Sequence, residues 1–224
     1  MTVYKIKHRD EFDFRLVTWG VVALTGAYIL VPPVLRSEPV QKTINAVGVA
    51  ASAISSGQNP ITAIANSGKL EPKWSSKKSP EFLQKVTKIA NELGGDPNHL
   101  MAIMHFESKL NHQAINPLSN ATGLIQFMPF TARRLGTSTS ALLAMTEIQQ
   151  LDYVRKYLIP YKGKLNTLGD FYCSVLWPAC VGSSESYVLF RVGTIQYRQN
   201  NGFDRNRDGV ITKSEITALV SERL

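Results

Sequence analysis

The sequence lacks the features of a metal finger, a nucleotide-binding domain or a repeat protein. It contains two cysteines and four histidines in 224 residues, and none of them lies at metal-finger spacing. There is no P-loop, no glycine pattern for a dinucleotide and no basic run interleaved with aromatic residues. No internal repeat is found. We therefore expect neither an organic cofactor nor a nucleic-acid partner.

The composition provides enough apolar residues for one core of ordinary size, together with an excess of positive charge. Hydrophobic residues make up 44% of the chain and the net charge is +8. A basic chain favours an anionic partner, such as a membrane surface or a cell-wall polymer. Strand-like alternation of apolar and polar residues is nearly absent, so we expect a mainly α-helical fold.

The two cysteines, Cys173 and Cys180, flank a segment that contains Pro178. Two buried free thiols are the simplest interpretation, because free cysteine is commonly a core residue. A disulfide is also geometrically allowed in an oxidising compartment. The sequence leaves both alternatives open.

An uncharged apolar segment occupies residues 16–35. A helix of that length spans about 30 Å, the thickness of the hydrocarbon core of a bilayer. Small residues suited to signal cleavage do not follow it closely, so we expect an uncleaved transmembrane anchor. Basic residues are more frequent before it, which predicts that residues 1–15 stay cytoplasmic and the rest is exported. The alternative is an apolar helix buried in a protein assembly.

Residues 36–78 are expected to form a tether, because their prolines, serines and small residues have little packing potential. From residue 79 onward the pattern is helical. One helix begins at Ser79 and Pro80 and ends at Gly94 and Gly95. Three more are predicted after Asp96, from Pro129 to Leu135, and after a capping box formed by Thr146 and Gln149.

Glu107 falls on the apolar face of the second of these helices, in line with Met104, Ile103 and Leu100. It also falls in the last turn, where the helix dipole opposes negative charge. Burial and this position both disfavour the charged form, so we expect a raised pKa for Glu107, which suits a general acid. The alternative is a buried glutamate neutralised by a salt bridge.

No Asp or Glu occurs from residue 108 through residue 146, so Glu107 has no partner carboxylate in the adjacent loop and helix. Ordinary glycosidases need two carboxylates, which act either as nucleophile and acid or as base and acid. A lone acid indicates a different mechanism.

Two motifs, Glu107-Ser108 and GLIQFMPFTA at residues 123–132, resemble those of the soluble-type lytic transglycosylases, which cleave peptidoglycan. The resemblance covers about residues 80–200 and implies a lysozyme-like helical fold. In that family one glutamate protonates the oxygen that links N-acetylmuramic acid to N-acetylglucosamine. The same glutamate then acts as base on the muramoyl 6-hydroxyl and closes a 1,6-anhydro ring. The resemblance thus implies that Glu107 alone is catalytic.

The resemblance also implies substrate-binding roles for Ser108, Gln126, Met128 and Tyr172. The alternatives for the first three are a helix-end serine, a surface amide and a core methionine. The segment around Tyr172 resembles the version common in phage-encoded members, although no asparagine follows the tyrosine. A virion-associated enzyme that opens the wall when the phage genome enters the cell is therefore implied.

Residues 204–215 fit the EF-hand calcium loop at every diagnostic position, with glycine at the sixth. The predicted calcium ligands are Asp204, Asn206, Asp208, Val210 through its carbonyl, Thr212 and Glu215. Only one such loop is present. We expect Ca²⁺ to be structural and to fix the carboxyl end rather than to act as a switch.

The expected organisation is a mainly α protein with an anchor at 16–35, a tether at 36–78, a lysozyme-like transglycosylase domain at 79–199 and an EF-hand-like tail at 200–224. Its expected partners are peptidoglycan glycan strands, the membrane and other virion or tail proteins. One rival is a lysozyme-type muramidase, which would recruit Asp152, Asp170 or Glu185 to activate water. Another is a non-catalytic structural component that docks to glycan.

Overall fold

The computed structural model describes residues 69–222, together with residues 43, 46 and 47. The predicted anchor at 16–35 and most of the predicted tether lie outside these residues. Within the described part of the chain, no helix is long and apolar enough to cross a membrane.

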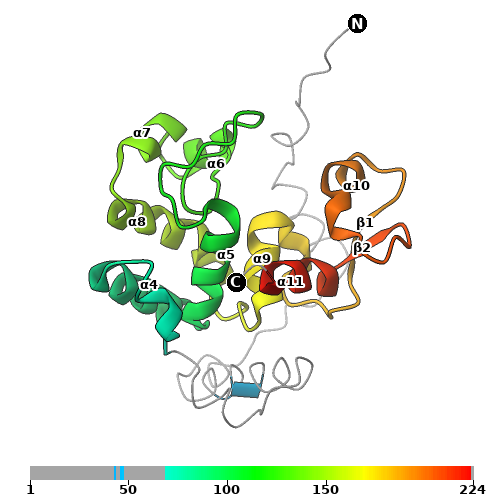
Figure 1. Cartoon of the computed structure of the whole chain (residues 1–224), viewed down its shortest axis with the longest axis horizontal. Coiled ribbons are helices and arrows are strands. Elements are labelled where there is room, and N and C mark those ends of the chain that lie inside the picture. The colour runs from blue at the N-terminus through cyan, green and yellow to red at the C-terminus, as the bar shows by residue number, and fades with distance from the viewer. Residues whose placement is uncertain (1–42, 44–45, 48–68, 223–224) are drawn as a thin grey trace, which may run out of the picture.

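The described part is mainly helical, as predicted, with one small sheet (Figure 1). In chain order the elements are η2 (Pro72–Trp74), α4 (Pro80–Leu93), α5 (Pro97–Ser108), α6 (Pro129–Arg134), α7 (Thr139–Ala144), α8 (Glu147–Leu158), η3 (Ile159–Tyr161), α9 (Leu168–Leu176), η4 (Pro178–Cys180), β1 (Val188–Arg191), α10 (Ile195–Asn200), η5 (Asn201–Phe203), β2 (Val210–Thr212) and α11 (Lys213–Glu222).

Local capping sets the helix boundaries that the sequence predicts. The Ser79 hydroxyl accepts a hydrogen bond from the backbone of Phe82 at the start of α4, and Gly94 ends this helix with a left-handed φ of 77°. The capping box of Thr146 and Gln149 is present at the start of α8. These parts of the helical prediction are confirmed.

Helix α5 lies at the centre of the molecule and packs against both α4 and α9 (Figure 1). The five residues 100–104 are all completely buried, because neighbouring helices cover this part of α5 on more than one face. Trp74 also joins the core, with 1% of its surface exposed, and its indole nitrogen donates to Asn98 Oδ1 at 3.1 Å. The end of the predicted tether therefore packs on α5, contrary to our expectation of low packing potential.

The carboxyl-terminal elements share the same core. Strand β1 pairs with β2 in an antiparallel sheet, and α11 packs on α9. The predicted boundary at residue 200 consequently falls at the end of α10 and between two paired strands. The expected tail is an integral part of the fold rather than an appendage.

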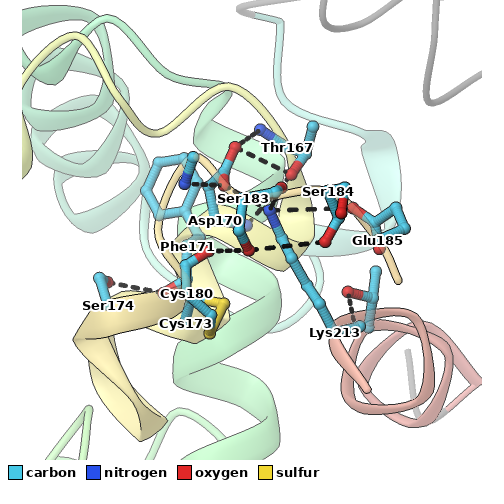
Figure 2. Close-up of a disulfide and its surroundings, with 12 residues drawn as sticks. Thr167, Asp170, Phe171, Cys173, Ser174, Cys180, Ser183, Ser184, Glu185 and Lys213 are labelled. Carbon is cyan, nitrogen blue, oxygen red and sulfur yellow. Dashed lines mark hydrogen bonds and ion pairs between the residues drawn. A yellow bond between two sulfur atoms is a disulfide. The ribbon is translucent and has the colours of Figure 1, made fainter. Parts of the chain in front are cut away.

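A buried ion pair joins α11 to α9 (Figure 2). Lys213 Nζ lies 2.6 Å from Asp170 Oδ1 and 2.9 Å from the Ser183 carbonyl oxygen. Lys213 and Asp170 are 1% and 3% exposed. The other oxygen of Asp170 accepts hydrogen bonds from Thr167, and Gly182 N donates to Oδ1 at 2.8 Å. Asp170 is thus fully engaged in holding the fold together.

Cys173 and Cys180 form a disulfide with a Cα–Cα distance of 5.5 Å (Figure 2). The simplest interpretation of the sequence, two free thiols, is therefore wrong. Helix α9 ends at Leu176 and the chain returns through η4, which brings the two cysteines together. The bond closes the segment between α9 and η4.

Candidate active site

A cleft of about 680 Å³ lies beside the carboxyl end of α5. Residues of α6 and of the end of α8 line one part of it, and residues 175–179 and α10 line another. Figure 1 shows α6 and α8 on one side of α5 and α10 on the other. The cleft therefore brings together elements that are far apart in the sequence.

Glu107 lies in the last turn of α5, as predicted, and its half-buried side chain lines the cleft. The helix ends directly after it, because Lys109 and Leu110 take left-handed φ values of 56° and 62°. Lys109 N donates to the His105 carbonyl at 2.9 Å, and Leu110 N to the Met104 carbonyl at 3.3 Å. These bonds close the final turn and fix the position of Glu107.

Among the described residues, Glu107 is the only Asp or Glu that lines the cleft. The three carboxylates that a muramidase could recruit lie elsewhere. Asp152 pairs with a lysine of α4 at 2.8 Å, Asp170 pairs with a lysine of α11 at 2.6 Å, and Glu185 lies 3.9 Å from that same lysine. No second carboxylate of the described chain is therefore available beside Glu107.

Ser108 is buried and does not line the cleft. Its hydroxyl lies 2.9 Å from the Met104 carbonyl oxygen and 3.0 Å from the Leu124 carbonyl oxygen, and it donates to these acceptors. The first carbonyl belongs to α5 and the second to the loop of the glycine-glutamine motif. Ser108 thus joins the end of the helix carrying Glu107 to the loop carrying Gln126.

Gln126 and Met128 both line the cleft, on the loop that leads into α6. Backbone hydrogen bonds of 3.0 and 2.9 Å between Thr122 and Phe127 close this loop. Gln126 has a φ of 51°, and its side-chain amide donates to the Gly123 carbonyl at 3.1 Å. Part of its hydrogen-bonding capacity therefore maintains the loop itself.

Gln150, which the sequence analysis did not single out, holds this loop through hydrogen bonds to its backbone and to neighbouring segments. It is completely buried, its Oε1 accepts from Leu124 N at 3.1 Å, and its Nε2 donates to the carbonyls of His112 and Leu142. A Cβ on Gly123 would lie 2.4 Å from Gln150 Oε1. The glycine of the motif is required because only hydrogen fits against this amide, and because its φ is 85°.

Tyr157, near the end of α8, and Tyr161, in η3, also line the cleft and were not predicted. The Tyr157 hydroxyl donates to the Ser174 carbonyl at 2.7 Å. Burial, followed by the proximity of Tyr161 and Glu107, raises the pKa of Tyr157 far above its ordinary value, and burial raises that of Tyr161 to about 12. The Tyr161 hydroxyl is buried without a hydrogen-bond partner among the described residues. Both phenols are neutral, and the second can still accept or donate a hydrogen bond.

Tyr172 is 2% exposed and does not line the cleft. Its ring packs edge-on to Phe106, with centroids 5.2 Å apart, and lies 5.9 Å from the ring of Phe203. Phe106 precedes Glu107 in α5. Tyr172 is therefore placed to support, from the core, the turn that carries Glu107.

The predicted calcium loop forms a compact turn through its own hydrogen bonds. Asp208 N donates to Asp204 Oδ1 at 3.2 Å and to Asn206 Oδ1 at 3.0 Å, and Val210 N donates to Asp208 Oδ1 at 2.9 Å. In the part of the chain that the structure describes, no three His, Cys, Asp or Glu side chains are grouped as a metal site.

Glu215 at the end of this loop lies near Thr212, whose backbone and hydroxyl donate to Oε2 at 2.8 and 2.7 Å. The other oxygen, Oε1, is buried without a hydrogen-bond partner in the described chain. A buried carboxylate oxygen without a donor is unfavourable. Carboxylate, amide and carbonyl oxygens are the ligands that Ca²⁺ prefers, and Glu215 Oε1 lacks a hydrogen-bond partner in the described chain. The residue types of the loop therefore fit a calcium ion.

Residues 84–155 match the family model of the transglycosylase SLT domain. An SLT domain is thus found over the segment that carries Glu107, Gln126 and Met128, and it ends at Arg155. No curated protein and no solved structure matches the chain. The match ends before α9, so Tyr172, the disulfide and the calcium loop lie outside it. It supports a peptidoglycan-degrading activity of the lytic transglycosylase type.

Proposed function

We propose that the chain is a peptidoglycan lytic transglycosylase, which cleaves the β-1,4 bond between N-acetylmuramic acid and N-acetylglucosamine and leaves a 1,6-anhydro end. The observation that carries this proposal is the position of Glu107 as the one carboxylate of the described chain on the cleft. The SLT match over residues 84–155 supports the same class of activity.

In the proposed reaction Glu107 acts twice. Its carboxyl group donates a proton to the glycosidic oxygen as the bond from that oxygen to C1 breaks. The resulting carboxylate accepts the proton of the muramoyl 6-hydroxyl as O6 forms a bond to C1. The proton lost in the first step is recovered in the second, so the reaction consumes no water and needs no second carboxylate.

The two rival functions predict different products. A muramidase would add water and leave reducing ends, but the three carboxylates that could activate that water are all engaged or placed away from the cleft. A docking module would leave the glycan intact. Mass spectrometry of murein incubated with the protein distinguishes anhydro ends, reducing ends and uncut strands. We expect anhydro ends.

The first prediction concerns Glu107→Gln. The amide keeps the shape of the side chain but cannot donate and recover a proton, so turnover should fall at least about 100-fold while the fold is retained. Release of anhydro-muropeptides measures this loss. Asp152→Asn is the matched control, because Asp152 is an exposed carboxylate outside the cleft and its loss should leave turnover unchanged. Near-normal turnover of Glu107→Gln would contradict the assignment.

The proposal extends to the placement of the enzyme. Residues 16–35 would anchor it with the catalytic part on the periplasmic side, in a virion-associated protein that opens the wall locally when a phage genome enters. The support is the uncharged segment, the basic residues before it and the phage-type resemblance around Tyr172.

The second prediction tests this placement. Protease added to spheroplasts should digest the catalytic part, while a short tag at the amino end stays protected because residues 1–15 are cytoplasmic. Immunoblotting with the tag and with a domain antibody measures both. Full-length protein that stays in solution without detergent would contradict a lipid anchor.

Calcium is proposed as a structural ligand of residues 204–215, held by the side chains and the carbonyl predicted from the EF-hand pattern. The support is the sequence pattern and the buried Glu215 oxygen that lacks a hydrogen-bond donor in the described chain. The ion would supply positive charge that lets the three carboxylates of the loop approach one another. It takes no part in the proton transfers of Glu107.

A further inference from the structure

The wall of the cleft that faces α6 and α8 is formed in part by α10, which lies 40 residues beyond the end of the SLT match at residue 155. Four residues of this helix line the same cleft as Glu107, namely Ile195, Gln196, Gln199 and Asn200. Their spacing of one, four and five places them on one face of the helix. The cleft is therefore completed by a segment outside the matched domain.

The cleft-facing side of α10 is polar but uncharged. It carries three side-chain amides and no charge, and Ile195 beside them is 46% exposed. Within the described chain, neither Gln196 nor Gln199 uses its side-chain amide in a hydrogen bond, whereas Asn200 donates to the Gln196 carbonyl at 2.9 Å. Two amides are thus available to a ligand, and each offers both donors and an acceptor.

The aromatic residues next to this face extend the same surface. Trp177 and Phe190 both line the cleft, and their rings meet edge-on with centroids 5.0 Å apart. Apolar aromatic surface beside side-chain amides favours ligands that are apolar on one face and polar around the rim. A pyranose ring with hydroxyl and N-acetyl groups has this character, whereas a charged peptide stem does not.

We propose that the cleft-facing side of α10 is a sugar-binding wall, in which Gln196 and Gln199 hydrogen-bond the hydroxyl and acetamido groups of an N-acetylated sugar next to the bond that is cleaved. The position of the wall in the cleft with Glu107 carries this inference; the identity of the sugar as part of peptidoglycan rests on the proposed function. The match to the SLT domain model ends at residue 155 and covers neither these amides nor their helix.

The carboxyl-terminal loop holds this wall in position. A helix of six residues is not stable alone, so α10 depends on its contacts. The Tyr197 hydroxyl donates to Asp204 Oδ2 at 2.5 Å, which ties the helix to the loop of residues 204–215. After α10, Phe203 lies 6.4 Å from the ring of Phe106, the neighbour of Glu107. Tyr197 is accordingly a positioning residue for the wall.

Binding measured without turnover tests the wall independently of the reaction. The full chain with Glu107→Gln is titrated with a soluble, uncrosslinked glycan strand by calorimetry. The titration is repeated with variants that carry Gln196→Ala or Gln199→Ala in addition. Each lost amide should raise Kd about 3- to 10-fold. Arg198→Ala is the control, because Arg198 belongs to α10 but does not line the cleft; at an ionic strength of about 0.15 M its lost charge is screened and Kd should stay within about 2-fold.

Equal Kd values for the amide variants and the parent would overturn the wall. The same experiment separates it from the proposed function. If the wild type releases anhydro products and both amide variants keep an unchanged Kd, the proposed function holds and the sugar-binding role of α10 is refuted. If the amide variants bind more weakly and the wild type cleaves nothing, the proposed catalytic function is refuted and the glycan-binding role of α10 is supported.

Tyr197→Phe tests the positioning role in the otherwise wild-type enzyme, because it removes one hydroxyl and keeps the ring. KM for the glycan strand should rise about 3-fold or more while kcat stays within about 2-fold, as expected for lost uniform binding. A lower melting temperature with an unchanged KM would show that the hydroxyl only stabilises the fold and would overturn the positioning role.

Discussion

The hydroxyl of Ser108 contacts the turn that carries Glu107 through backbone carbonyl groups. It lies 2.9 Å from the carbonyl oxygen of Met104, in the helix that carries Glu107, and 3.0 Å from that of Leu124, in the motif that carries Gln126. A serine in this position fixes how far Glu107 stands from Gln126. The geometry therefore gives Ser108 a role in position rather than in sugar contact.

The third prediction is that Ser108→Ala lowers kcat more than it raises KM. Loss of the hydroxyl leaves two buried carbonyls with one donor fewer, which should cost about 1–2 kcal/mol of unfolding free energy. Denaturant titration and steady-state kinetics measure the two effects. Ser140→Ala, at an exposed position on α7, is the control. A raised KM with an unchanged kcat would instead support the sugar contact that the resemblance implies.

The motifs of the sequence led to residues that the structure places on the cleft, whereas residues without a local signal were missed. Glu107, Gln126 and Met128 line the cleft, as the motifs imply. Gln150 and Tyr157 were missed because their roles depend on distant backbone atoms, and a single glutamine or tyrosine on a helix gives no local signal. The amides of α10 recur at helical spacing in the sequence. This spacing does not indicate a binding site until the structure shows that the amides line the cleft.

At the scale of elements, the disulfide closes the segment that forms part of the cleft. Five residues that line the cleft, 175–179, lie between Cys173 and Cys180. Both cysteines are completely buried, so the bond is shielded by its surroundings. Its position links the covalent structure of the chain to the shape of the site, including the ring of Trp177.

The fourth prediction is that loss of this disulfide weakens substrate binding as well as stability. The closed loop is short, so the double variant Cys173→Ser and Cys180→Ser should lose roughly 2 kcal/mol of unfolding free energy. KM should rise because residues 175–179 are less constrained. Melting curves with and without reductant measure the effect, and the double variant should no longer respond to reductant. An unchanged KM would separate the disulfide from the cleft.

Helices with a distinct cap and one apolar stripe were predictable, whereas α9, which is largely buried, and the two strands, which depend on distant pairing, were not. α4 and α8 have both signals. Seven successive residues of α9, from Leu168 to Ser174, are buried, so no polar face marks its period. Strands β1 and β2 contain four and three residues and become a sheet only on pairing across the intervening loop.

For the whole molecule, the fifth prediction is that calcium raises the melting temperature. An ion bound to the folded loop alone stabilises by mass action, by about 2.7 kcal/mol at a free concentration one hundred times Kd. A chelator should lower the melting temperature, and Asp204→Ala should remove that response, because Asp204 is the first of the proposed calcium ligands. Asp152→Asn should keep it. An unchanged melting temperature in the wild type after chelation would contradict calcium binding.

The same prediction separates stability from chemistry. Because the ion has no role in the proton transfers of Glu107, kcat at saturating substrate and low temperature should survive chelation. KM should rise, since Asp204 also accepts the hydrogen bond of Tyr197 that positions α10. A complete loss of kcat with the fold intact by circular dichroism would place calcium in the catalytic step.

The buried pair of Lys213 and Asp170 also affects the order in which a new chain can complete its fold. Asp170 is enclosed in α9, and the ammonium group that neutralises it arrives 43 residues later. Removing one partner of a buried ion pair is strongly destabilising, by about 3–5 kcal/mol. A chain still held in the ribosome or in an export channel lacks that partner, and β1 lacks β2. We therefore expect the part of the cleft formed by α10 to reach its final structure only after the chain has been released as far as Lys213.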